Sequence, residues 1–547
     1  MKSAGAIEAA TSSPGRLKGG NVKSEVKREA NVIAGAGVQP RLTWQNILMA
    51  ASLAGVLFLA LYNLTSYPLP WYDEGSHLHV PKTLVRFGVY ADYSSEGFRY
   101  YGPTVGIGPT VFLPIAAMFK LFGVGLFQAR LVMALFLLAA IAAFYRLAGV
   151  MGAQKFAWVA TALLVATRAV GLLEYGRQVL GEVPGLFFMA AGFAVWFGVW
   201  EKASWRQLTL AGLLLGLALV TKNQYLLVLA PTLLFAWAAN LYYRSAPQRV
   251  FLVPGSIAAA CFALWQAYTI IYLGPATAGE NLASWRAATA SVVVLFDPSL
   301  MSRALGELLG MKAFLGLLLP ALIYSVTLIL PRRRDGHQWG ILCALVAVNF
   351  VWYVVASISW TRYAFPGLAV SCLFVARFFH DLTDGYHFDW PALKTAWQKR
   401  QFPQADSLRW VLLAWLTAAI LIPLGLIAKD IVRPPFNAPQ AMAAYLDENV
   451  PKDQLIETWE PELGFLTDHN YHYPPQLLLY TAVKYIWLED AQTAPSDEYH
   501  FVETERPPYV IISTFGRFVE VYPYQIMEAN YDLVTTIGEY ELYELKK

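Results

Sequence analysis

Two adjacent carboxylates mark the segment of the chain with the most suggestive chemistry, WYDEGSHLH at residues 71–79. Asp73 and Glu74 lie just beyond the first long apolar run. Adjacent carboxylates at the mouth of a membrane protein suit a general base acting on a hydroxyl or amine, or a cation site. The structural alternative is an acidic pair in the first turn of a helix, where the helix dipole favours negative charge.

Two histidines follow the acidic pair. His77 and His79 are two positions apart, which places them on one face of a strand but on different faces of a helix. Together with Asp73 and Glu74 they define a candidate metal site. The HxH pattern is a weak metal signature when it stands alone. The metal site is therefore kept as an alternative to a metal-free role for the two acids.

Three further charged residues lie at the ends of apolar runs: Glu182 in RQVLGEVPG, Lys222 in TKNQ and Arg362 in SWTRYAFPG. A cation held next to hydrocarbon is costly unless it is paired, so we expect Lys222 to contact Glu182 or an anionic lipid phosphate. Arg362 is suited to bidentate binding of a phosphate. The alternative for Arg362 and the adjacent Tyr363 is an interfacial anchor, which is common at membrane surfaces.

The segment that follows the histidines supplies more candidates. Arg99, Tyr100 and Tyr101 precede an apolar segment at 105–122 that contains two internal prolines. Arg99 is a further candidate for binding a phosphate. The apolar segment is suited to flank a groove for a polyisoprenoid tail.

The composition identifies the kind of protein that positions these residues. The chain has 547 residues, of which 57% are hydrophobic and 14% charged, and its mean hydropathy is +0.43. Soluble domains have roughly 45–50% apolar and about 25% charged residues. These values exclude a disordered, collagenous, coiled-coil or disulfide-rich protein and favour a polytopic membrane protein. The net charge of +3 is too small to indicate nucleic-acid binding.

The apolar runs predict the membrane-spanning helices. A helix needs about 20 residues to cross the hydrocarbon of a bilayer. Eleven runs are candidates, of which 207–221 is the shortest: 44–62, 127–145, 156–173, 183–200, 207–221, 225–243, 250–273, 312–330, 339–357, 363–380 and 409–428. No secretory signal precedes the first run, and the three cysteines, Cys261, Cys343 and Cys372, lie in apolar runs that favour free thiols.

Loop charge predicts the orientation. If the segment 105–122 stays on the outer surface as a juxtamembrane helix, the basic loops face the cytoplasm, including the run Arg332, Arg333 and Arg334. If 105–122 crosses the membrane, the basic loops after it face outward. We therefore predict eleven spans and one outer helix, with residues 1–43 as a disordered cytoplasmic tail.

The polar segments complete the predicted architecture, an α-helical transmembrane domain at 44–429 followed by a small extracytoplasmic α/β domain at 430–547. Large outer loops are expected at 63–126 and 274–311. In the C-terminal domain, 509–513 and 532–537 have the pattern of strands, and 437–450 has the pattern of a helix capped by Asn437.

Several of these segments, in this order, resemble the GT-C fold of polytopic glycosyltransferases, near the protein O-mannosyltransferases and the bacterial lipid A aminoarabinose transferases. The resemblance covers roughly residues 44–380. It rests on WYDEGSHLHVPKTLVRFG, on GPTVFLPIAAMFKLFG followed by ARL, and on RQVLGEVPGLFF, LGLALVTKNQYLL and TRYAFPGLAV.

The resemblance implies a donor sugar on polyprenyl phosphate, used on the outer face by an inverting enzyme that often needs no metal. Asp73 corresponds to the catalytic base of the family. Lys222, Arg362 and less directly Arg99 correspond to residues that bind the donor phosphate. Glu182 stands where the family often has an aspartate, and Glu74 belongs to the same acidic motif or flanks it.

The sequence therefore predicts a membrane glycosyltransferase of the cell membrane that moves a hexose or pentose from a polyprenyl-phosphate donor to a lipid, polysaccharide or protein. No cofactor is required, with a divalent metal ion as the alternative. The first rival is a lipid or solute transporter with a charged outer gate, although carriers tend to place such charges near the bilayer midplane. The second is a non-catalytic scaffold in which residues 430–547 bind a partner.

Overall fold

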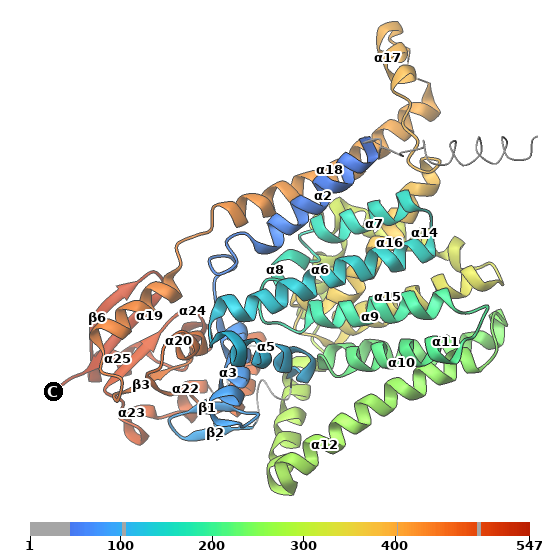
Figure 1. The fold of residues 1–547 in the computed structure, drawn as a ribbon. Helices are drawn as coiled ribbons and strands as arrows, with labels where there is room; N and C mark the ends of the chain where they lie inside the picture. The colour runs from blue at the N-terminus through green and yellow to red at the C-terminus, as the bar shows by residue number, and fades with distance from the viewer. Residues whose placement is uncertain (1–43, 101–105, 402, 489–493) are drawn as a thin grey trace, which may run out of the picture. The chain divides into compact units, whose positions relative to one another are not determined.

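The computed structural model describes residues 44–547 except 101–105, 402 and 489–493. The predicted tail at 1–43 and Tyr101 lie outside the described residues. The chain divides into two compact units, Met1–Gly55 and Val56–Lys547. In the first unit, the described part is the beginning of helix α2 (Trp44–Leu61). Apart from the beginning of α2, the features below belong to the second unit, and Figure 1 shows the labelled helices and strands coloured along the chain.

The predicted apolar runs are helical. They correspond to α2, α6 (Leu126–Met151), α7 (Gln154–Ala166), α9 (Glu182–Gly198), α10 (Trp205–Leu219), α11 (Asn223–Tyr243), α12 (Arg249–Ala288), α14 (Leu318–Ile329), α15 (Arg334–Ala356), α16 (Phe365–Leu382) and α18 (Gln404–Val432). Within the described chain, six helical segments are long and apolar enough to cross a membrane: 126–151, 223–243, 249–288, 334–356, 361–382 and 404–432. The protein is therefore a polytopic α-helical membrane protein, and the number of eleven spans stays a prediction.

Small residues let the central helices approach one another closely. A Cβ atom on Gly212 of α10 would lie 2.9 Å from the backbone of Pro254 in α12. A Cβ atom on Gly192 of α9 would lie 2.9 Å from the side chain of Leu215 in α10. Such contacts between backbones are typical of membrane helices, whose association depends on close packing.

Two segments differ from the sequence prediction. The run 156–173 is divided, because α7 ends at Ala166 and the short helix α8 (Leu172–Tyr175) follows a turn. The predicted loop 274–311 is largely helical. α12 continues to Ala288 through a bend at Gly274, whose φ of 78° suits glycine, and is followed by α13 (Pro298–Leu309). All three cysteines are free, as expected.

The first loop supplies the helix that carries the acidic motif. It contains α3 (Tyr72–Phe87), the hairpin β1 (Asp92–Ser94) and β2 (Gly97–Arg99), and α5 (Pro109–Phe122), the helix expected at 105–122. Asp73 and Glu74 lie in the first turn of α3, where the helix dipole favours negative charge.

The C-terminal part of the chain contains a five-stranded sheet with the order β4-β3-β5-β7-β6. β3 (Leu455–Thr458) pairs in parallel with β4 (Asn470–His472) and β5 (Tyr509–Ile512), whereas β6 (Tyr531–Ile537) and β7 (Tyr540–Leu545) pair in antiparallel fashion. The predicted helix is α19 (Ala438–Asn449), and the Asn437 side chain accepts a hydrogen bond from the Gln440 N–H, as expected of a cap. The two predicted strands and this helix are therefore confirmed.

One face of α3 packs against this C-terminal part. Tyr72 stacks on Phe515 with ring centroids 3.7 Å apart. A Cβ atom on Gly75 would lie 2.2 Å from the backbone nitrogen of Glu462, so only glycine permits this contact. Both contacts tie the first turn of α3 to the C-terminal domain.

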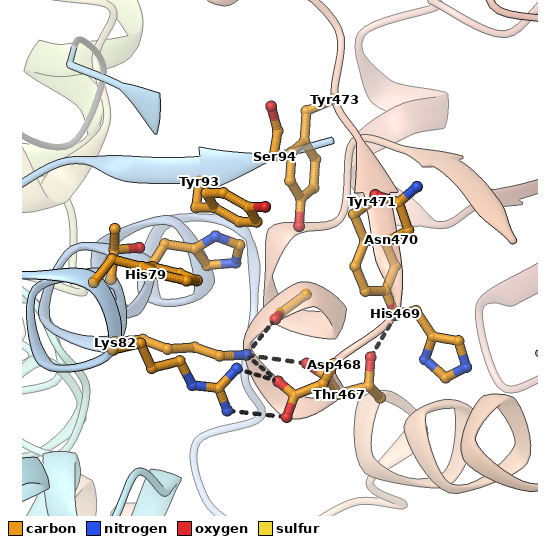
Figure 2. A pocket seen from close by; sticks show the side chains of 14 residues that line it. His79, Lys82, Tyr93, Ser94, Thr467, Asp468, His469, Asn470, Tyr471 and Tyr473 are labelled. Atoms are coloured by element: carbon orange, nitrogen blue, oxygen red, sulfur yellow. Dashed lines mark hydrogen bonds and ion pairs between the residues drawn. The ribbon is translucent and has the colours of Figure 1, made fainter. Parts of the chain in front are cut away.

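The same face of α3 continues the contact through polar side chains. Lys82 donates to the carbonyl oxygens of Gly464, Phe465 and Thr467 at 2.8–3.2 Å, and it lies 2.9 Å from the Asp468 carboxylate (Figure 2). One turn later, Arg86 binds Asp468 through both guanidinium nitrogens. α3 is thus fixed along its length to the C-terminal domain, and this fixes the direction of its opposite face.

Candidate active site

Asp73 forms an ion pair with Arg362, 289 positions away in the sequence. Asp73 comes from the first turn of α3 and Arg362 from a 3-10 turn at Thr361–Ala364 that precedes α16. The guanidinium of Arg362 lies 5.5 Å from the ring centroid of Trp71 and 5.0 Å from that of Trp360. These rings restrict the guanidinium and exclude water from one side of the pair.

A second ion pair joins Lys222 to Glu182. Glu182 begins α9 and is fully buried, and Lys222 is the residue before α11. The Tyr225 hydroxyl donates to the backbone carbonyl of Glu182 at 2.5 Å, which fixes α9 against α11. Of the two partners considered for Lys222, the structure contains Glu182.

The two ion pairs belong to one site. Lys222 acts electrostatically on Asp73, and Arg362 acts electrostatically on Glu182. Gln224, two residues after Lys222, donates to the backbone carbonyl of Tyr363 at 2.6 Å and so links the segments that carry the two cations. The four residues that the sequence singled out from four separate segments therefore meet.

The charges of the site control two titrating groups on α3. Burial raises the pKa of Asp73, but the cations Arg362 and Lys222 hold this pKa below its ordinary value. Asp73 is therefore ionised at neutral pH. Burial lowers the pKa of His77 to about 4, so this imidazole is neutral at neutral pH. Its Nδ1 lies 2.7 Å from the carbonyl oxygen of Val179, which requires Nδ1 to carry the proton.

Glu74 faces a different environment from its neighbour. Its carboxylate and the Arg130 guanidinium form a two-point ion pair at 2.8 and 2.5 Å, and both side chains are fully buried. The backbone N–H of Val179 adds a hydrogen bond at 3.2 Å, and Arg130 also donates to the carbonyl of Leu64. Glu74 therefore joins α3 to α6 and lies outside the pairs formed by Asp73 and Glu182.

Arg99 also lies in another set of contacts. It forms an ion pair with Asp92 and lies 4.8 Å from the ring centroid of Tyr473. His79 approaches the same carboxylate at 2.9 Å. Although burial raises the pKa of Asp92, Arg99 and His79 lower it to about 2. The structure thus places Arg99 at the junction of the first loop and the C-terminal domain.

The two histidines do not share a metal site. Because they lie on a helix, His77 faces Val179 and His79 faces Pro461, whose carbonyl lies 2.8 Å from Nε2. Across the described ranges, no group of three or more His, Cys, Asp or Glu side chains could hold a metal ion. The helical spacing thus separates the two histidines in this structure, and the alternative of a divalent metal ion in the site stays a prediction.

Several polar atoms in the site are buried without a hydrogen-bond partner. They are Oε2 of Glu182, Nε of Arg362 and the hydroxyl of Ser359. Buried polar atoms are usually satisfied in native proteins, and exceptions often mark a place for a ligand or an unseen water. A cavity of about 620 Å³ adjoins Arg362, Trp71 and Ser359.

Sequence reasoning missed the residues around this cavity, notably Trp71, Trp360 and Ser359. Both tryptophans are close in sequence to a singled-out charge, since Trp71 stands two positions before Asp73 and Trp360 two before Arg362. This repeated spacing, a tryptophan two positions before a charged site residue, is the sequence signal that could have identified the two tryptophans. Tyr363 lies next to Arg362, with its ring centroid 5.7 Å from the guanidinium. Tyr100 lines a second cavity of about 310 Å³, together with Trp265.

Comparison with known proteins agrees with this architecture. Residues 107–268 match a family model described as dolichyl-phosphate-mannose-protein mannosyltransferase. No curated protein matches the sequence at a significant level. Among solved structures, ArnT from Cupriavidus metallidurans bound to undecaprenyl phosphate matches with a TM-score of 0.61 and 14% identity, over 92% of this chain and 98% of that chain.

A second match is the oligosaccharyltransferase AglB from Archaeoglobus fulgidus, solved with an inhibitory peptide and a dolichol-phosphate. Its TM-score is 0.54 at 14% identity, and the alignment covers 92% of this chain and 75% of that chain. Each match covers 92% of this chain, and both proteins have the GT-C fold. The fold expected from the sequence is therefore confirmed.

Proposed function

We propose that this chain, which has the GT-C fold, is a membrane glycosyltransferase that moves a sugar from a polyprenyl-phosphate donor to an acceptor. The observation that carries the proposal is the meeting of two ion pairs, Asp73–Arg362 and Lys222–Glu182, from four separate segments. The similar ArnT and AglB structures contain undecaprenyl phosphate and dolichol-phosphate, which are lipid phosphates of this class.

Lys222 and Arg362 bind the donor phosphate in this proposal. Both cations are paired with carboxylates, and the Nε of Arg362 is free to donate. A guanidinium and an ammonium can share the oxygens of one phosphate. As the bond between the anomeric carbon and the phosphate oxygen breaks, they stabilise the charge that develops on the leaving phosphate. Arg99 takes no part in this step, because its ion pair with Asp92 lies outside the two pairs of the site.

Asp73 acts as the general base. It is ionised at neutral pH, and its Arg362 partner lowers its basicity. When the donor phosphate binds Arg362, the ion pair weakens and the pKa of Asp73 rises. Asp73 then accepts the proton of the acceptor nucleophile, which attacks the anomeric carbon from the side opposite the phosphate and inverts its configuration.

Glu182 and His77 position these groups. Glu182 holds Lys222, and its unpaired oxygen Oε2 is directed to a hydroxyl of the bound sugar. Neutral His77 adds no charge next to Asp73. Glu74 positions the first turn of α3 through Arg130. We derive no step through a metal ion, because the side chains of the site do not form a metal-ligand set.

We place the site on the outer face of the cell membrane and the N-terminal tail in the cytoplasm. This placement follows from the concentration of Lys and Arg in the opposite set of loops. Cysteine labelling at Arg333 in intact cells tests it. Access only from the cytoplasm supports the placement, and labelling from outside contradicts it.

The decisive experiment incubates the purified full-length chain in lipid nanodiscs with radiolabelled hexoses and pentoses on polyprenyl phosphate and with candidate glycan, glycolipid and peptide acceptors. The expected result is release of polyprenyl phosphate by the wild type and none by Asp73→Asn. No release from any donor contradicts a transferase. A parallel measurement of solute or lipid transfer across sealed vesicles distinguishes the rival transporter, which moves its substrate without cleaving a donor.

A further inference from the structure

The cavity of about 620 Å³ is bordered by only one side of the site. Trp71 and Arg362 line it, whereas Lys222 and Glu182 do not. It therefore adjoins the Asp73–Arg362 pair and lies away from the Lys222–Glu182 pair. A general base must contact the nucleophile whose proton it accepts. Asp73 does not itself line the cavity, but its partner Arg362 does, so if Asp73 is the base, the molecule that supplies the nucleophile reaches it from this cavity.

The walls of the cavity have mixed chemistry. Aromatic rings come from Tyr67, Trp71, Tyr175 and Trp360, and charged groups come from Glu174, Glu307, Arg303 and Arg362. Aromatic faces pack against the C–H face of a sugar ring, while carboxylates and guanidinium groups bind its hydroxyls. Small-molecule sites are typically about 300–1,000 Å³ with a few polar groups in an apolar lining, and this cavity is large enough for one or two sugar units.

The charges argue against a second anion beside the donor phosphate. Arg362 is occupied by Asp73 and, in the proposed function, by the donor phosphate, and Glu307 is paired with Lys312 at 3.0 Å, so Glu174 and Arg303 are the other charged groups of the lining. A second phosphate in this cavity would face Glu174 and the donor phosphate on Arg362, and repulsion between like charges disfavours it. A neutral or amino-bearing ligand fits the lining better.

Ser359 is held in an unusual conformation at the wall. Its φ is 59°, a left-handed value that is uncommon for serine. Its backbone N–H donates to the Ser357 hydroxyl at 3.1 Å, and its carbonyl accepts from the Tyr353 hydroxyl at 3.0 Å. The side chain is 2% exposed, and its hydroxyl has no partner. Strained residues with unsatisfied groups tend to occur at sites of function.

We infer that this cavity is the acceptor subsite and that it takes a neutral or amino-bearing carbohydrate, with Ser359 and Glu307 binding its hydroxyl or amino groups. The inference rests on the proposed function, because the role of Asp73 as base makes the adjoining cavity the acceptor's. The sequence left the acceptor open among lipid, polysaccharide and protein. The inference selects a carbohydrate acceptor, which is a glycan or the sugar headgroup of a glycolipid.

Saturation-transfer NMR on the full-length chain in nanodiscs tests the inference. The probes are methyl glycosides of neutral hexoses, pentoses and hexosamines, together with short peptides that contain serine or threonine. At least one glycoside is expected to bind saturably. Ser359→Gly, which suits the φ of this position, and Glu307→Gln are each expected to weaken that binding about three- to tenfold, the effect of one lost hydrogen bond.

The control is Glu448→Gln on the exposed surface of α19, which is expected to leave glycoside binding unchanged. Three outcomes overturn the inference: no glycoside binds, only the peptides bind, or the glycoside binds equally to both cavity variants. Release of polyprenyl phosphate is measured on the same preparation. Release without glycoside binding refutes the acceptor assignment alone, and binding without release refutes the transferase alone.

Discussion

Two groups of buried carboxylates lie on opposite sides of α3, and they differ in what neutralises them. On one side, Asp73 and Glu182 pair with the cations Arg362 and Lys222. On the other, Glu460 and Glu462 of the C-terminal domain accept hydrogen bonds from uncharged backbone N–H and tyrosine hydroxyl groups.

The difference is visible in their titration. Cations hold the pKa of Asp73 below its ordinary value despite burial. In the C-terminal domain, burial raises the pKa of Glu460, and that of Glu462 to about 7. Glu460 accepts from the backbone N–H groups of Ser513 and Gly516, which do not offset burial. Burial of an acid alone therefore does not identify a catalytic group, and the charge of its partner is more informative.

The prediction with the largest expected effect compares the enzymatic activity of one variant from each group of buried carboxylates. Asp73→Asn should lower the rate of polyprenyl-phosphate release by about 10²–10⁴-fold, because a general base contributes that much. Glu462→Gln is the matched control and should retain activity, since its carboxyl is buried away from the ion pairs. Rates are measured on protein that elutes as a single species. Loss of activity in the control alone would reverse the comparison.

The next effect concerns stability and the neighbouring acid. Glu74→Gln leaves the buried Arg130 charge without its partner and should destabilise the fold by about 3–5 kcal/mol. Thermal unfolding in detergent measures this loss. The double variant Glu74→Leu/Arg130→Met removes both charges and should recover most of the stability. An unchanged melting temperature in Glu74→Gln would show that the pair is not structural.

A third experiment tests whether Lys222 stabilises the leaving phosphate or only neutralises the buried carboxylate of Glu182. Lys222→Met should lower donor turnover by about 10²–10³-fold, since a positioned cation stabilises the leaving phosphate. The variant also leaves Glu182 unpaired and should melt at a lower temperature. Lys222→Met/Glu182→Gln should restore the melting temperature but not the turnover. Recovery of turnover in the double variant would assign Lys222 a structural role.

The smallest expected effect is the dependence of stability on pH. The pKa of Glu462 is raised in the folded state to about 7, from an ordinary value of 4.5. The folded state therefore holds more protons than the unfolded state between these values, and stability falls as pH rises through this window. The rise of this pKa from 4.5 to about 7 corresponds to a change in stability of about 3 kcal/mol. Asp73 has the opposite sign, because its lowered pKa contributes stability that is lost as pH falls below about 3.8.

Hydrogen exchange of β5 and β7 at pH 5 and pH 7.5 measures the contribution of Glu462. Protection should be lower at pH 7.5, and Glu462→Gln should remove the difference. Equal protection of the wild type at both pH values would contradict the raised pKa.

The helices and the convergence of the four charged residues could be predicted from the sequence for a physical reason. Long apolar runs leave few alternatives to membrane helices, and counting them places Asp73, Glu182, Lys222 and Arg362 at turns on one side. Residues at such turns are brought close when the helices pack.

The finer arrangement depends on contacts that no local pattern encodes. Glu74 differs from Asp73 only by one step around α3, yet this step turns it toward Arg130. Arg99 is paired within its own hairpin by Asp92, seven positions earlier. The extension of α12 to Ala288 runs through Gly274 and Pro275, residues that usually indicate the end of a helix. In each case tertiary packing decided between outcomes that the sequence left open.

The contact at Gly75 has a consequence for the modularity of the protein. Because the backbone of Glu462 lies where a side chain on residue 75 would be, even a methyl group would act as a wedge between α3 and the C-terminal domain. The two segments are therefore complementary surfaces that must change together. A chimera that receives a foreign C-terminal domain should need the matching first loop as well, and the acidic motif cannot be transplanted without the domain that supports it.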